Sequence, residues 1–265
     1  MKKLFGNIRI DFCRAFFSVS LLLAAVGMCA ALFSSISTEV SSLAHGEKLD
    51  VLYLFRVAGM QGFSLLSVIF ATLPYSTSFC TDWSNQFIRS SVIRTNINSY
   101  SISKVFTCAF AGGSAVAIGE ILFMLILHMK LPLVDSESHM FANAVSAPIY
   151  GSLLSDGNYI VYFAAQIVIV FFASAFFAVL ALCISTYLPN VFVTMASPVL
   201  FFYFFIRIPQ LMGLSTLWFH KALFGTFYPG RPYLSLLYSI FICSLLCVLM
   251  GILIVRQIKR RLEHG

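Results

Sequence analysis

Long apolar runs separated by short polar intervals are the main feature of the sequence. A helix needs about 20 residues to cross the hydrocarbon core of a bilayer. Inside that core the backbone has no water to hydrogen-bond, so a run of this length is expected to be helical. The pattern predicts an all-α integral membrane protein with one transmembrane domain over residues 1–265. Its six predicted transmembrane helices cover roughly residues 16–36, 56–80, 105–127, 159–187, 191–206 and 233–255.

Two further segments are predicted to lie at the membrane surface. Residues 2–15 place Leu4, Ile8 and Phe12 on one helical face, away from the basic side chains. This pattern favours an interfacial helix on the anionic inner leaflet over a simple frayed start of the first span. Residues 209–232 contain an apolar stretch of about 14 residues, which is too short to span. This stretch predicts a re-entrant or interfacial hairpin before the last span.

The polar interval over residues 79–104 differs from the others because it carries both basic charge and an apolar face. Four apolar residues follow one another at spacings of four, one and four, which a helix gathers onto one side: Trp83, Phe87, Ile88 and Val92. This spacing predicts a short amphipathic helix over residues 82–96 on the inner membrane surface. A helix in this position can receive a push from a soluble partner.

The net charge of +7 comes from basic residues that gather at the ends of the apolar runs. Membrane proteins show this distribution when the basic ends lie in the cytoplasm. With both termini inside, the inner segments hold eleven Lys or Arg residues and the outer segments hold six. We therefore expect a multi-pass protein of the cytoplasmic membrane with both termini in the cytoplasm. Its expected surroundings are membrane lipids, and no nucleic acid.

Motifs for autonomous catalysis are missing from the sequence. The chain has no GxxxxGK[ST] loop for nucleotide phosphates, and neither HExxH nor GxSxG occurs. Its cysteines and histidines are too dispersed for a metal site. We therefore expect no catalytic residues, no metal site and no cofactor bound by this chain, which by itself is not an enzyme.

Three Glu or Gln residues lie within the predicted spans: Gln61, Glu120 and Gln166. Glu120 is about eight residues from the outer end of its span, or roughly 12 Å deep at about 1.5 Å per residue. An acidic side chain at that depth is costly unless it faces protein or water. One interpretation makes the three residues a polar lining for a substrate route. The other makes Glu120 and Gln166 a hydrogen-bonded packing pair.

A ladder of small residues occupies every fourth position of the same span, at Ala111, Ala115 and Gly119. Small residues at this spacing allow a second helix to approach closely. The ladder therefore predicts helix packing and no chemistry.

Over residues 79–104 the chain resembles the permease subunits of ATP-binding-cassette (ABC) exporters of the second type. The resemblance rests on an acidic–aromatic start, a basic centre and a terminal lysine: Asp82–Trp83–Ser84–Asn85, Phe87–Ile88–Arg89, Arg94–Thr95, Tyr100 and Ser103–Lys104. The family usually has glycine where this chain has Gln86. Its members also share the layout predicted here, with an interfacial helix, six spans, a coupling helix between spans two and three, and a hairpin before the last span.

The resemblance implies a permease that works with a second permease copy and two cytoplasmic ABC ATPase subunits. ATP and Mg²⁺ would be bound by the ATPase partner. The residues implied to couple the two proteins are Asp82, Trp83, Gln86, Phe87, Ile88, Arg89 and Arg94. The implied function is ATP-driven export of an amphipathic or hydrophobic substrate such as a peptide. The alternative is a membrane protein outside the ABC class, either a secondary transporter or an assembly or anchoring protein.

Overall fold

The computed structural model describes residues 2–37, 39, 49–62, 65–88, 92, 95–136, 139–147, 149–213, 218–227 and 230–264. Within these residues the regular structure is entirely helical. The helices are α1 (Lys2–Phe16), α2 (Val19–Ser35), α4 (Val51–Gly62), α5 (Leu66–Thr72), α6 (Ser78–Ser84), α8 (Ile97–His128), α9 (His139–Val145), α10 (Gly151–Ser155), α11 (Tyr159–Tyr187), α12 (Val191–Phe202), α13 (Ile208–Leu211), α14 (Trp218–Leu223) and α15 (Pro232–His264), with a π-helical turn at Tyr203–Arg207 between α12 and α13.

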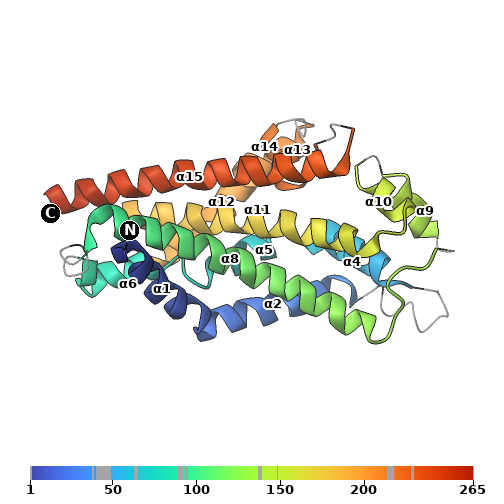
Figure 1. Cartoon of the computed structure of the whole chain (residues 1–265), viewed down its shortest axis with the longest axis horizontal. Helices are drawn as coiled ribbons and strands as arrows, with labels where there is room; N and C mark the ends of the chain where they lie inside the picture. The colour runs from blue at the N-terminus through green and yellow to red at the C-terminus, as the bar shows by residue number, and fades with distance from the viewer. Residues whose placement is uncertain are drawn as a thin grey trace.

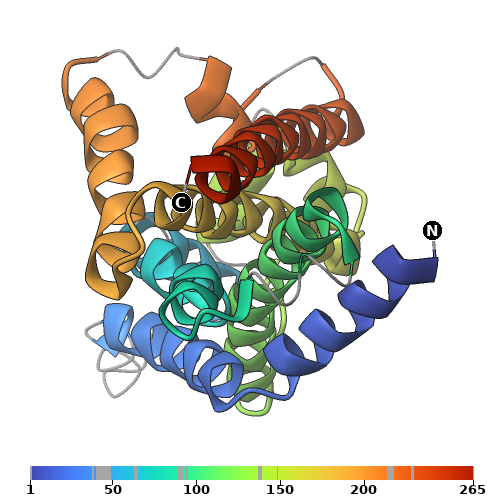
Figure 2. The ribbon, with the colours of Figure 1, turned by 90° about the vertical axis from the view of Figure 1, so that its left-hand side faces the viewer.

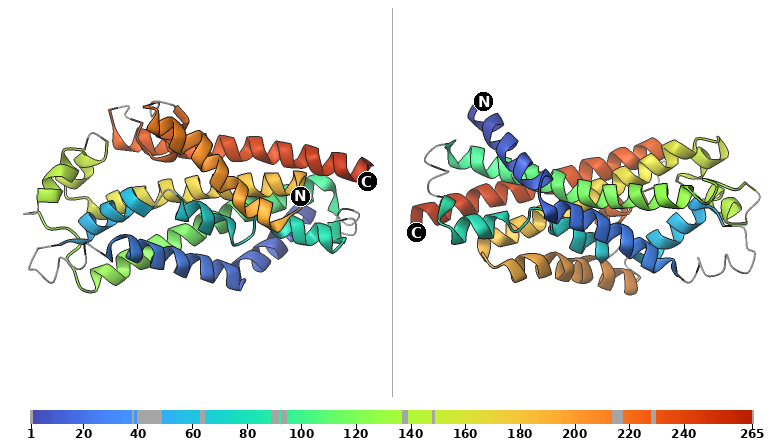
Figure 3. Two further views of the ribbon diagram at one scale, coloured as in Figure 1. Left: turned by 180° about the vertical axis from the view of Figure 1, so that it is seen from behind. Right: turned by 90° about the horizontal axis from the view of Figure 1, so that it is seen from below.

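The long helices α8, α11 and α15 run side by side along the length of the molecule (Figure 1). Helix α11 lies in the middle of the bundle, where it packs against α8, α15, α12 and α5 (Figure 2). Both chain termini lie toward one end of the bundle, together with α6 and the start of α8 (Figures 1 and 3). We call this end the terminal end. The opposite end carries α9, α10 and the start of α4, and we call it the loop end.

In the part of the chain that the structure describes, three helices are long and apolar enough to cross a membrane: Ile97–His128, Tyr159–Tyr187 and Pro232–Glu263. A fourth span is possible if Phe5–Phe16 and Val19–Ser35 count as one, although the two are bent by 52°. These helices have the composition of a membrane protein, as predicted. The apolar helix Val191–Phe205 is shorter than a full span. Six spans, and an interfacial position for residues 2–15, stay predictions.

The segment predicted as one span over residues 56–80 is divided in the structure. Its described residues form α4, α5 and the start of α6, and a turn over residues 73–77 separates the last two. Pro74 lies in this turn, and a proline has no backbone N–H to make the next helical hydrogen bond. The kink predicted at Pro74 is therefore a complete helix end at Thr72.

The predicted hairpin over residues 209–232 consists of α13 and α14, with residues 214–217 and 228–229 outside the described part. Ala222 and Leu223 of α14 are buried against the bundle. The Ser235 hydroxyl of α15 donates a hydrogen bond to the Gly225 carbonyl at 3.1 Å, which ties the returning chain to the start of the last helix. A re-entrant or interfacial position for this segment stays a prediction.

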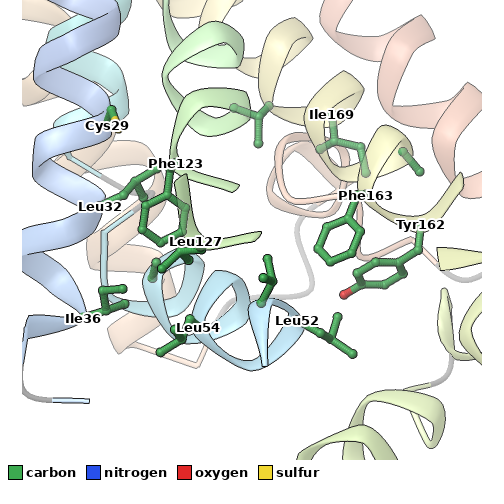
Figure 4. Packing of buried hydrophobic residues seen from close by; sticks show 14 of the residues in the cluster. Cys29, Leu32, Ile36, Leu52, Leu54, Phe123, Leu127, Tyr162, Phe163 and Ile169 are labelled. Atoms are coloured by element: carbon green, nitrogen blue, oxygen red, sulfur yellow. The ribbon is translucent and has the colours of Figure 1, made fainter. Parts of the chain in front are cut away.

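The loop end of the bundle is filled by one apolar cluster. Side chains from α2, α4, α8 and α11 converge there (Figure 4). The packing includes the edge-on contact of Phe33 with Phe123, at 4.8 Å between ring centroids. Members of the cluster include Leu32, Ile36, Leu52, Leu54, Phe123, Leu127, Tyr162 and Phe163. A second cluster at the terminal end joins α1, α2, α8, α11 and α15.

Glycines of α8 allow its neighbours to approach closely. A Cβ atom at Gly119 would lie 2.7 Å from the Met28 Cβ and 2.8 Å from the Ala25 carbonyl oxygen, both on α2. At Gly112 it would lie 2.4 Å from the Ala178 Cβ of α11. The small-residue ladder predicted in this span is therefore confirmed as a packing face at Gly119. Gly112 adds a second close contact that the ladder did not include.

We expect the substitution Gly112→Ala to lower the stability of the bundle. The added methyl group would overlap Ala178 and the Ala71 carbonyl oxygen, which lies 2.6 Å away. Overpacking of this kind costs about 1–3 kcal/mol. The thermal midpoint of the protein in detergent measures the effect.

Gly59→Ala is the matched control, because a Cβ at Gly59 of α4 meets nothing within 4 Å. The better helix propensity of alanine should leave its midpoint unchanged or slightly higher. Equal midpoints for the two variants would contradict close packing at Gly112.

Candidate functional site

Three segments that are distant in the sequence meet in a buried ionic cluster at the terminal end. The Lys104 ammonium of α8 lies 2.8 Å from the Asp82 Oδ2 of α6 and 3.5 Å from the Asp11 Oδ1 of α1. Relative exposure is only 1% for Lys104, 2% for Asp82 and 7% for Asp11. Charges this deeply buried are stable only when they are paired and hydrogen-bonded. We call this group, together with the side chains that hydrogen-bond to it, the ionic cluster.

Hydroxyl groups complete the hydrogen bonding of both carboxylates. Tyr75 donates to the Asp11 Oδ1 at 2.6 Å, and Ser103 donates to the Asp11 Oδ2 at 2.5 Å. Tyr100 donates to the Asp82 Oδ2 at 2.9 Å, and Lys104 donates to the Tyr75 hydroxyl at 2.9 Å. Each carboxylate therefore has a cation and at least one neutral donor.

The helical repeat of α8 explains how one helix supplies three members of the cluster. Tyr100, Ser103 and Lys104 are at positions i, i+3 and i+4, which lie on one face. Arg14 of α1 adds a second cation at the edge, where its Nη2 lies 3.5 Å from the Asp82 Oδ1. The Arg14 side chain is 46% exposed, so its contribution is screened by solvent more than that of Lys104. Formal charges in the cluster balance, with two acids and two bases.

The chain turns shortly after Asp82, the residue that α6 contributes to the cluster. Helix α6 ends at Ser84, and Gln86 has a φ of 55°, in the left-handed region that glycine occupies at little cost. This is the position at which the family named above usually has glycine. Because the chain turns here, the described residues do not form one continuous helix over residues 82–96. The described part of the predicted coupling helix is therefore the end of α6, a turn at residues 85–86, and helical residues from Phe87 on.

The turn separates the side chains that were predicted to share one apolar face. Trp83 is 37% exposed and Phe87 is 51% exposed, whereas Ile88 is 3% exposed and packs in the second apolar cluster. Ile88 is thus a core residue, and Asp82 belongs to the ionic cluster. Both side chains were predicted to lie on the surface, and both are buried. We call the exposed part, residues 83–87, the aromatic turn.

Two of the predicted coupling residues, Arg89 and Arg94, lie outside the described residues. Gln86 is exposed within the aromatic turn. The predicted third span starts earlier than residue 105, because α8 begins at Ile97. The end of the 79–104 interval is therefore the first part of α8, and it supplies Tyr100 and Lys104 to the cluster.

The C-terminal end of α15 contacts the aromatic turn. The Arg261 guanidinium lies 4.8 Å from the ring centroid of Trp83, within the range of a cation–π interaction. Arg261 also donates a hydrogen bond to the carbonyl oxygen of Tyr187 at the end of α11. Ile254 and Ile258 of α15 are buried in the second cluster. The last helix therefore continues past residue 255 as a packed element.

Of the three predicted polar residues of the spans, the two whose side chains are described, Glu120 and Gln166, do not form a hydrogen-bonded pair. Glu120 is 4% exposed, and its Oε2 atom has no hydrogen-bond partner in the described part of the chain. Gln166 is partly buried, and no hydrogen bond or ion pair joins it to Glu120. The packing-pair interpretation is therefore wrong for these described side chains. The side chain of Gln61 lies outside the described part, so a polar lining stays a prediction.

Comparison with known proteins provides no relative. No protein-family model matches the chain, no curated protein matches its sequence, and no solved structure matches its fold. Within the described residues, no group of three or more His, Cys, Asp or Glu side chains is placed to hold a metal ion.

The sequence did not predict the ionic cluster, although four of its residues carried the resemblance: Asp82, Tyr100, Ser103 and Lys104. These four residues were assigned to the 79–104 segment, and no contact with Asp11 was predicted. An available signal was that Lys104 lies at the start of a long apolar run with no acid within four residues on its helix. A buried lysine in that position requires a partner from another element.

We expect Lys104→Met to destabilise the protein strongly. The substitution leaves Asp11 and Asp82 as buried carboxylates without their main cation, and breaking a buried pair in this way costs about 3–5 kcal/mol. Chemical or thermal denaturation in detergent measures the loss. Adding Asp11→Asn and Asp82→Asn should restore most of it, because amides keep the hydrogen-bond acceptors without the charge.

Lys259→Met removes a lysine from an exposed ion pair, since the Lys259 side chain is 63% exposed and 3.9 Å from Glu263. Exposed pairs contribute little, so this control should behave like the wild type. Wild-type stability for Lys104→Met would show that the cluster is not paired as described.

We expect Glu120→Leu to raise the stability of the protein. A buried polar atom without a partner costs about 1–3 kcal/mol, and leucine fills a similar volume without that cost. Thermal denaturation is the measurement, and Glu263→Leu, at an exposed position of α15, is the control. A lower midpoint for Glu120→Leu would contradict the absence of a partner.

Proposed function

We propose that this chain is the membrane-spanning permease subunit of an ATP-driven ABC exporter, coupled to a separate cytoplasmic ATPase. The observation that carries the proposal is the aromatic turn, which exposes Trp83 and Phe87 at the terminal end of an apolar helical bundle. The resemblance of residues 79–104 to the coupling segment of such permeases supports the same proposal. The proposal also agrees with the general membrane-protein character of the chain, which has helices long and apolar enough to span a membrane.

The aromatic turn has the properties of an interface anchor. Large aromatic side chains contribute most when they insert into a pocket of a partner. Phe79 stacks on Trp83 at 6.1 Å between centroids, and Arg261 covers part of the Trp83 ring. These contacts hold the indole in place before a partner binds, which lowers the entropy cost of binding.

In this proposal the terminal end faces the cytoplasm, as the distribution of basic residues favours. Two ATPase subunits bind ATP and Mg²⁺, and each pushes on the aromatic turn of one permease in a permease pair. The bundle then changes between inward-facing and outward-facing arrangements. An amphipathic or hydrophobic substrate, such as a peptide, is the class that suits spans with few polar side chains.

A second candidate function is favoured by Glu120. A secondary transporter needs an ionisable group within its spans, and Glu120 is buried there without a partner for its Oε2 atom among the described residues. This function does not require the aromatic turn to bind a soluble protein. The two candidates therefore differ in whether residues 83–87 contact an ATPase.

We expect a photo-reactive amino acid placed at Phe87 to cross-link to an ATPase in native membranes. Mass spectrometry of the cross-linked product should identify a protein with a GxxxxGK[ST] loop. Combining Trp83→Ala with Phe87→Ala should weaken co-purification of that ATPase by at least about tenfold, because two anchor side chains are lost.

Phe192→Ala is the matched control. Phe192 is 84% exposed and lies in the first turn of α12, outside the aromatic turn. Its loss should leave co-purification unchanged. Cross-linking of Phe87 to lipid alone, with transport that needs no ATPase, would reject the exporter and favour the secondary transporter.

A further inference from the structure

The ionic cluster connects segments whose helices otherwise share little packing. Helix α6 packs mainly against α11, and α1 packs along α8. The contact of α1 with α8 has its own apolar support, since Phe12 lies 6.0 Å from both Phe106 and Phe110 between ring centroids. The link from α6 to α1 and α8 combines Phe79, which packs in the second apolar cluster, with the polar contacts around Asp82.

Lys104 is the centre of this link. Its ammonium group has three hydrogens, and its three close oxygen neighbours belong to three segments. They are Asp82 of α6, Tyr75 of the turn before α6, and Asp11 of α1. A displacement of α6 must therefore break the 2.8 Å contact or carry Lys104 and Asp11 with it.

Stability alone gives a weak reason for such a cluster. Apolar residues of similar volume in place of a buried ion pair are often neutral or stabilising. Complete pairing does, however, define one arrangement of the joined segments, because every alternative leaves a charge buried without its partner. The cluster is thus suited to holding elements in a fixed relative position.

The exposed side chains of the aromatic turn are adjacent to this cluster in the chain. Trp83 follows Asp82 directly, and Arg14 reaches the second oxygen of the same carboxylate from α1. Helix α1 continues into α2 after a break at Phe17 and Ser18, where the Ser18 hydroxyl accepts a hydrogen bond from the Leu21 amide. A path of direct contacts therefore runs from the aromatic turn through α1 to the start of α2.

We propose that Lys104 is a positioning residue that makes α1, α6 and the first turns of α8 move as one body. A displacement of the aromatic turn then reaches α2 without a change in the relative positions of these three segments. The rigid connection is a property of this chain alone. Only the source of the displacement, a bound ATPase, rests on the proposed function.

The test measures distances between spin labels on the full-length chain in nanodiscs. Cys13 of α1 and Ser84 of α6 are both exposed, so labels at Cys13 and at Ser84→Cys report on the link between α1 and α6. We call these two labels the α1–α6 pair. The α1–α8 pair carries labels at Cys13 and at Ile102→Cys, and Ile102 is 47% exposed. The other six cysteines are replaced by alanine in both cases.

We expect one narrow distance distribution for each pair in the wild-type cluster. In the neutralised variant Asp11→Asn/Asp82→Asn/Lys104→Met, the distribution of the α1–α6 pair should become at least about twice as wide. The distribution of the α1–α8 pair should stay narrow, because the Phe12 contacts remain. Lys259→Met/Glu263→Gln removes an exposed ion pair at the same end and should change neither distance.

A distribution of the α1–α6 pair that stays narrow in the neutralised variant would overturn the proposal. If the triple variant does not fold, which broadening of both pairs would reveal, Asp82→Asn alone is measured against the same criterion.

With a co-purified ATPase trapped by ATP and vanadate, the wild-type distance of the α1–α6 pair should not shift, and a shift would also overturn the proposal. Failure of any ATPase to bind the wild type would instead reject the proposed function.

Discussion

The pairing of Lys104 with Asp82 and Asp11 is the constraint on which the terminal end of this structure depends. A charge placed among apolar helices cannot be left without a partner, because water is not there to solvate it. Three segments must therefore come together at one point before any of the three charges is stable. The order of α1, α6 and α8 around the cluster follows from this requirement, and so does the place where the chain turns to expose Trp83 and Phe87.

A different constraint organises the middle of the bundle. There the packing of the helices depends on how closely their backbones can approach. Because Gly112 and Gly119 have no side chain, α11 can approach α8 closely at Gly112 and α2 can do so at Gly119. Close packing at these positions leaves α8 in contact with most of the other long helices, so the helix that carries Lys104 is also the one that the bundle is built on. The cluster is therefore attached to a helix that packs against α1, α2, α11 and α15.

These features favour a protein whose energy source is outside the chain. The exposed aromatic side chains lie beside the ionic cluster, an arrangement that suits the proposed coupling to an ATPase. Glu120 is the part of the structure that this interpretation does not use. Its burial, without a partner for Oε2 among the described residues, is an energetic cost that packing does not explain, and it is the reason that a secondary transporter is kept as the second candidate.

The sequence by itself determined the class of protein and the position of its most apolar helix. The span predicted at about residues 159–187 coincides with α11, because Asn158 precedes the apolar run and Pro189 holds Leu188 in an extended conformation. Prediction was wrong over residues 82–88, where helical spacing placed Ile88 beside Trp83 and Phe87. Periodicity describes only neighbours on one continuous helix, and the left-handed conformation at Gln86 ends that helix. Ser103 and Asp11 are 92 residues apart in the chain, and their contact exists only because α1 folds back along α8. Tertiary structure alone therefore decided which of the polar residues are buried and paired, since the desolvation of a charge depends on every element that surrounds it.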